Sequence, residues 1–230
     1  MTIPDLLSVF SALDLAALAI LIAVWWGSGW VTEHPPRARP STTVLMSRYR
    51  HEWMVQMITR QPRIFDAAIL SSLKQGTTFL ASGAMLAVGG VLALAGNAEP
   101  LTQIVDEVGV EAHPSLFWQG KLAVIALLLT HSVFRFVWSN RLFGYCAVVM
   151  ASVPNDANDP RALPRAAKAA EINVRAALNY NSGLRSVYFA FATLGWLIGP
   201  WTLLASVAVT AWVVLGREFR SASRGVLLED

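Results

Sequence analysis

Apolar residues dominate four long stretches of this 230-residue sequence, and polar residues gather between them. The stretches cover approximately residues 6–29, 75–95, 117–138 and 188–215. Roughly 20 apolar helical residues cross the hydrocarbon core of a bilayer, so each stretch can span a membrane. The pattern predicts an all-α, polytopic membrane protein with four transmembrane helices. No Lys or Arg precedes the first stretch and no clear cleavage site follows it, so we expect an anchor rather than a removable signal peptide.

The composition agrees with this class of protein. Hydrophobic residues make up 55% of the chain and charged residues 14%, whereas soluble domains carry about 25% charged residues. The single cysteine, Cys146, excludes an intrachain disulfide and a Cys-x-x-Cys site. Only one histidine, His131, falls at membrane depth, which excludes a haem held by two histidines. We expect one membrane domain over residues 1–230, with no cofactor, no metal ion and no nucleic-acid partner.

Basic residues are concentrated in two of the three connections. Cytoplasmic loops accumulate Lys and Arg. The sequence therefore predicts helical cytoplasmic loops at residues 31–63 and 139–187, and an external loop at residues 96–116, which has four acids and no Lys or Arg. Both termini then lie on the external side of the cell (inner) membrane.

The C-terminal tail leaves an alternative open. After Leu215 the chain carries Arg217, Arg220 and Arg224, which are unusual in an external tail. In the alternative, the fourth stretch is re-entrant and broken at Gly199–Pro200. The C-terminus then returns to the cytoplasm.

Both cytoplasmic loops carry helical patterns. Thr42 or Thr43 is placed to cap a helix through VLMSRYRHEWMVQMITR, which Pro62 ends. In the second loop, the apolar segment LFGYCAVVMASV continues the third membrane helix beyond Trp138, so it must be buried by protein. An Ala-rich helix at about residues 163–181 follows. We expect these helical extensions to pack into one cytoplasmic layer.

Two ionisable residues lie inside the third membrane helix, in the segment LLLTHSVFRFVWSNR. His131 and Arg135 are four residues apart and therefore share a helix face. The side chain of Arg135 is long enough to reach the headgroups, but His131 lies deeper and must face protein or a water-filled cavity. Two roles remain open for His131: a buried, hydrogen-bonded structural histidine, or a proton carrier or ligand.

Other charges fall at two depths. Asp14 and Lys121 lie at similar depth near the external side, which predicts an ion pair between them. In the alternative, each side chain extends separately to the nearby membrane interface. Near the inner side, Lys74, Arg135 and Arg185 form a basic rim. This rim can hold an anionic lipid headgroup or guide an anion, although the ordinary positive-inside bias also explains it.

Small residues mark two helices for close packing. The second membrane helix has Gly83 and Ala87 at small-xxx-small spacing, and the fourth has Gly195 and Gly199 followed by Pro200. We expect close helix contacts at these positions and a bend at Pro200.

One segment carries a family resemblance. NYNSGLRSVYFAFATLGWLIGP, together with ALDLAALAILIAVWW and SRYRHEWM, resembles the family called domain of unknown function 599. The matching positions include Asp14 in the first membrane helix, and Asn179, Gly183, Leu184, Arg185, Tyr188 and Phe189. The resemblance implies a bacterial or plant multi-helix membrane protein, and it implies no substrate. It also implies that Arg185 and Tyr188 matter more for function than their positions alone indicate. The alternative is that residues 179–183 only form a turn that seats the fourth membrane helix.

Three functions fit these features. The first is a homo-oligomeric channel or transport protein for ions or small solutes, anions included. The second is a non-catalytic accessory or scaffold subunit of a larger membrane complex, and the third is a lipid-modifying membrane enzyme. No catalytic pair stands out at one depth, so we favour the first function over an enzyme. Its polar path or anion site would consist of Asp14, Lys74, Lys121, His131, Arg135, Arg185 and Tyr188.

Overall fold

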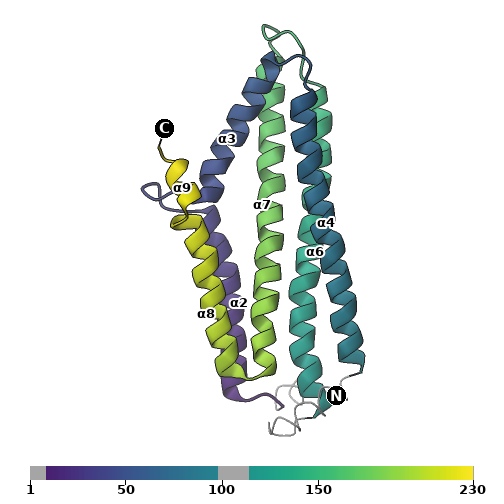
Figure 1. Ribbon diagram of the computed structural model, residues 1–230, viewed down its shortest axis with the longest axis vertical. Helices are drawn as coiled ribbons and strands as arrows, with labels where there is room; N and C mark the ends of the chain where they lie inside the picture. The colour runs from purple at the N-terminus through teal and green to yellow at the C-terminus, as the bar shows by residue number, and fades with distance from the viewer. Residues whose placement is uncertain (1–8, 98–113, 230) are drawn as a thin grey trace.

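The protein is an elongated bundle of long helices in this computed structural model, which describes residues 9–97 and 114–229 (Figure 1). The described residues form helices and turns without a strand. The short helices η1 and α9 lie at the same end of the bundle as α3, called here the α3 end; the opposite end, where α4 finishes, is the Gly96 end. The helices are α2 (Ala12–Glu33), α3 (Thr42–Gln56), η1 (Met57–Thr59), α4 (Ile64–Gly96), α6 (Ser115–Ala151), α7 (Ala162–Leu194), η2 (Gly195–Leu197), α8 (Pro200–Phe219) and α9 (Ala222–Val226).

Four of these helices are long and apolar enough to cross a membrane, as the sequence predicts. They are α2, α4, α6 and the α8–α9 segment from Pro200 to Val226. Large apolar side chains point outward on them: Phe79 is 77% exposed, Leu86 78% and Trp212 71%. Such exposure is costly in water and ordinary in lipid, so the surface of the bundle agrees with a membrane protein.

The centre of the bundle is the pair α6 and α7, which run side by side for most of their length. α4 packs on α6, whereas α2 and α8 pack on the other side of α7. Gly183 allows the central pair to come close, since a Cβ there would lie 2.7 Å from Cε1 of the buried Phe136. Because α7 runs unbroken from Ala162 to Leu194, residues 179–183 are helical and do not form the turn considered as an alternative.

The α3 end has the predicted helical layer. α6 continues unbroken to Ala151, and Phe143 and Cys146 on this extension are buried against α3 and α7. The helix from α3 through η1 ends at Thr59, three residues before Pro62, as expected. Its cap differs from the prediction: the hydroxyl of Ser41, rather than of a threonine, accepts the hydrogen bond of a first-turn N–H.

Thr43 is not free to cap α3 because it is engaged elsewhere. Its N–H and its hydroxyl donate to the two carboxylate oxygens of Glu218, at 2.9 Å and 2.8 Å. This contact joins α3 to the last turn of α8. A distant partner has therefore decided which residue caps the helix.

The expected single helix over residues 188–215 is wrong, because the chain reverses inside it. Residues 188–194 end α7, and α8 begins at Pro200 and runs back beside α7 (Figure 1). Proline has no N–H and its ring clashes with the preceding helical turn, so α7 cannot continue. Gly195 allows the return, since a Cβ there would lie 2.8 Å from Ser206 Oγ. This is the break at Gly199–Pro200 that the re-entrant alternative contained.

The reversal places the basic tail at the α3 end. The Arg224 Nε–H donates to the carbonyl of Pro40 at 2.9 Å, and the Thr42 hydroxyl donates to the carbonyl of Glu218 at 3.1 Å. Because α2 begins at the Gly96 end, the described chain starts and finishes at opposite ends of the bundle. This contradicts the expectation of two termini on one side. Residues 1–8 and most of the expected acidic loop, residues 98–113, lie outside the described residues.

Candidate functional site

A cavity of about 500 Å³ lies between α2, α6 and α7, toward the α3 end. α7 contributes Arg175, Asn179, Ser182 and Arg185, which recur at three- and four-residue spacing and so share one helix face. α2 contributes three tryptophans and Glu33, and α6 contributes His131, Arg135 and Trp138. The lining therefore carries three guanidinium groups and one carboxylate. We call this space the arginine cavity.

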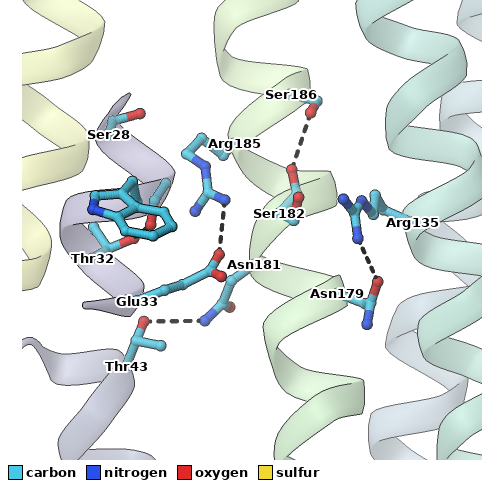
Figure 2. A network of polar contacts seen from close by, with 12 residues as sticks. Ser28, Thr32, Glu33, Thr43, Arg135, Asn179, Asn181, Ser182, Arg185 and Ser186 are labelled. Atoms are coloured by element: carbon cyan, nitrogen blue, oxygen red, sulfur yellow. Dashed lines mark hydrogen bonds and ion pairs between the residues drawn. The ribbon is translucent and has the colours of Figure 1, made fainter. Parts of the chain in front are cut away.

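Arg185 crosses from α7 to α2. Its Nη2 lies 3.1 Å from the Glu33 carboxylate, and the side chain is only 11% exposed. Figure 2 shows this guanidinium between the two helices. It lies directly over Gly29, where a Cβ would be 2.6 Å from the same Nη2. Any side chain at this position would require the guanidinium to move from where it lies.

Arg135 and Arg175 are more exposed than Arg185. The Arg135 Nη1–H donates to the Asn179 side-chain oxygen at 3.0 Å (Figure 2), and its Nε–H donates to His131 Nε2 at 3.2 Å. Arg175 pairs with Glu171 at 2.8 Å, but 66% of its side chain remains exposed. Both guanidinium groups keep N–H donors that can turn toward a ligand in the cavity.

The bottom of the arginine cavity is closed by a hydrogen-bonded cluster on three helices. The hydroxyl of Ser186, on α7, donates to the Ser182 carbonyl at 3.0 Å. It also receives the indole N–H of Trp25 at 3.1 Å and lies 2.8 Å from His131 Nδ1. The rings of Trp25 and His131 also make an edge-to-face contact, with their centroids 5.0 Å apart.

This cluster assigns the tautomer of His131. A hydroxyl has one hydrogen, and the hydrogen of Ser186 goes to Ser182, so His131 Nδ1 must be the donor in the contact with Ser186. Nε2 accepts from Arg135 and therefore carries no hydrogen. From these two contacts we infer a neutral imidazole with its proton on Nδ1. This arrangement favours the structural interpretation of His131.

Asp14 and Lys121 lie at the other end of the bundle and do not form the predicted ion pair. No ion pair within 4.0 Å joins these two described residues; instead both bind Trp196. The indole N–H of Trp196 donates to Asp14 at 2.7 Å, and the Lys121 ammonium donates to the Trp196 carbonyl at 2.7 Å. Pro200 cannot supply an N–H to that carbonyl, so Lys121 takes the place of the missing backbone donor.

The seven residues proposed as one polar path therefore fall into separate places. His131, Arg135 and Arg185 meet in the arginine cavity, but buried apolar side chains of α6 and α7 separate them from Asp14 and Lys121. Lys74 lies on α4, with its ammonium near Gly144 of α6. Tyr188 points toward α8, and its hydroxyl accepts from Arg217 Nη1 at 3.2 Å. The cavity that contains His131 does not reach Asp14 or Lys121.

Several cavity residues were not predicted from the sequence. Arg175 and Glu33 fall within the predicted cytoplasmic loops, and Trp26 and Trp30 fall at the end of the first apolar stretch. A signal was present: Arg175, Asn179 and Arg185 recur on one face if residues 163–194 are taken as one helix. Among residues 9–97 and 114–229, no group of three or more His, Cys, Asp or Glu side chains is placed to hold a metal ion.

Comparison with known proteins gives one match. The model of the family described as protein of unknown function, DUF599, matches residues 16–223. No curated protein and no solved structure matches the chain. The match covers most of the four apolar helices and the whole of the arginine cavity. The chain therefore belongs to the DUF599 family.

Proposed function

We propose that this protein is an integral protein of the cell (inner) membrane that binds an anion in the arginine cavity and transports ions or small solutes, chiefly anions. The supporting observation is the lining of the cavity, which carries the guanidinium groups of Arg135, Arg175 and Arg185 with Glu33 as its one carboxylate. Guanidinium groups bind carboxylates and phosphates through paired, charge-assisted hydrogen bonds.

The distribution of charge supports an orientation with the α3 end in the cytoplasm. Both Arg-rich connections and the basic tail lie at this end, and cytoplasmic segments are enriched in Lys and Arg. The arginine cavity then lies near the cytoplasmic interface. Tryptophan favours that interface, and Trp26, Trp30 and Trp138 line the cavity.

The closed bottom of the cavity supports a carrier rather than a continuous channel. Below His131 and Ser186, the bundle is filled by buried apolar side chains, including Ile125, Leu129 and Phe189. A carrier that exposes its site to one side at a time is closed on the other side. The structure would then represent the state open toward the cytoplasm.

Uptake by reconstituted protein tests the proposal. The full chain is inserted into liposomes, and uptake of labelled phosphate and succinate is measured for wild type and the double variant R135Q/R175Q. We expect at least about tenfold less uptake by the double variant, since each lost charge-assisted hydrogen bond weakens binding by about this factor. The matched control is R48Q, because Arg48 is exposed on α3 and does not line the cavity. Equal uptake by all three proteins would contradict the proposal.

His131 gives a second test. His131→Ala removes part of the closed bottom, so we expect an altered transport rate or an altered pH dependence without loss of expression. Uptake identical to wild type between about pH 5 and 8 would contradict proton-linked transport through this residue.

A second candidate function is that of a non-catalytic accessory subunit. Two observations favour it. Gly83 and Ala87 are exposed on α4, where another helix can approach closely. Asp14 and Lys121 are already satisfied by Trp196 within the chain. Native mass spectrometry of the detergent-extracted particle separates the two functions, because the transport function expects a homo-oligomer and the accessory function expects a co-purifying partner.

A further inference from the structure

The arginine cavity opens on the side of the bundle, between α2 and α6. Both helices pack along α7, but their own backbones seldom come close to one another. Trp26, Trp30 and Trp138 flank the opening and are 68%, 57% and 48% exposed. Exposed tryptophans on a membrane protein lie at the level of the lipid headgroups. The cavity can therefore be reached from the lipid leaflet as well as from water.

An apolar stripe leads away from the opening on each of the two helices. On α2, Ile22 lies one turn before Trp26 on the same face and is 51% exposed. On α6, Leu127 and Phe134 share a face with Trp138, and each is 69% exposed. Both stripes run from the cavity toward the Gly96 end, which is the direction that acyl chains take from a headgroup at the α3 end.

The charges inside the cavity favour a negatively charged lipid headgroup over a zwitterionic one. Three guanidinium groups and one carboxylate favour a phosphate that carries net negative charge. Tryptophan rings also bind quaternary ammonium groups, but the surplus of guanidinium groups repels choline. The volume of about 500 Å³ lies within the usual range of roughly 300–1,000 Å³ for ligand sites.

We propose that the anion bound in the arginine cavity is the phosphate headgroup of an anionic glycerophospholipid. The lipid enters sideways between α2 and α6, its phosphate meets Arg135 and Arg175, and its acyl chains lie along the two apolar stripes. This inference rests on the proposed anion site and names its ligand. A water-soluble phosphate ester offers the same chemistry without the chains, so the test must separate the two sources.

Native mass spectrometry of the purified full chain tests the lipid. The chain is incubated with equal amounts of dioleoyl phosphatidylglycerol and dioleoyl phosphatidylcholine, which share their acyl chains and differ in headgroup charge. We expect wild type to retain phosphatidylglycerol selectively. We expect R135Q/R175Q to lose about tenfold of this selectivity, and R48Q to keep it, because only the first variant removes guanidinium groups from the cavity.

Soluble competitors separate a lipid from a free phosphate. The same incubation is repeated with glycerol 3-phosphate or inorganic phosphate in large excess, and we expect neither to displace phosphatidylglycerol, since neither contacts the apolar stripes. Displacement by either competitor would overturn the lipid assignment and leave the anion site standing. A wild type without lipid selectivity that still binds inorganic phosphate, measured by tryptophan fluorescence, would also overturn the lipid assignment alone. A wild type indistinguishable from R135Q/R175Q with every probe would overturn both proposals.

Discussion

Asp14 and Lys121 are joined through one residue, Trp196, whose indole N–H binds the carboxylate and whose carbonyl binds the ammonium. The three side chains are buried. Asp14 also accepts the hydroxyl of Ser11 at 2.6 Å and completes the capping box of α2. The cluster thus fixes the start of α2, the start of α6 and the reversal between α7 and α8 at one point of the fold.

Substitution of Asp14 tests this cluster. Asp14→Ala should lower the free energy of unfolding by about 2–4 kcal/mol, because it removes the carboxylate half of the capping box and leaves the buried indole N–H of Trp196 without an acceptor. Ser11→Ala should cost only about 1 kcal/mol, since it removes the cap alone. Thermal unfolding in detergent measures both. Asp14→Asn keeps an acceptor oxygen and should fall between them; an Asp14→Ala protein as stable as Ser11→Ala would contradict the bridge.

The inferred tautomer of His131 can be tested by NMR spectroscopy. In protein labelled with ¹⁵N at histidine, the His131 signals should show a protonated Nδ1 and an unprotonated Nε2, because Ser186 requires a donor and Arg135 requires an acceptor. The His131→Asn variant identifies the signals among those of the four histidines. Two protonated nitrogens at neutral pH would show that the Arg135 contact is not formed.

Gly29 and Gly27 form a matched pair on α2. Gly29→Ala should destabilise the protein by about 1–3 kcal/mol and weaken anion binding, because its Cβ would displace the Arg185 guanidinium and strain the contact with Glu33. Gly27→Ala should be neutral or slightly stabilising, since nothing lies within 4 Å of a Cβ there and alanine favours the helix. Unfolding and phosphate binding are measured for both variants. Equal effects would mean that Arg185 moves aside without cost.

The orientation of the chain can be tested with introduced cysteines. Cys146 is fully buried and is first replaced by Ala; single cysteines are then placed at Arg37, Ser223 and Asn97. A membrane-impermeant maleimide added to intact cells should label only Asn97→Cys, because the other two positions lie at the basic α3 end. Labelling of Ser223→Cys together with Asn97→Cys would restore the arrangement in which both termini are external.

Features that depend on single segments were predictable from the sequence. The apolar length of α2, α4 and α6, the continuation of α6 beyond Trp138 and the end of the α3–η1 segment before Pro62 all follow from local rules. The cost of placing a segment in lipid or of breaking a helix at proline depends on that segment alone. The positive-inside rule also indicated, through Arg217, Arg220 and Arg224, that the C-terminus could return to the cytoplasm.

Tertiary structure alone decided which of these segments meet. From the sequence, Pro200 permits a bend or a reversal, and the reversal follows from the packing of α8 against Gly195 and α2. Asp14 and Lys121 have complementary charges at similar depth, but Trp196 offers both of them better-placed partners. Arg175 and Glu33 belong to the arginine cavity only because α2, α6 and α7 converge there. The sequence therefore determined a helical membrane protein with a basic end, whereas the cavity arose from contacts between distant helix faces, which no local pattern encodes.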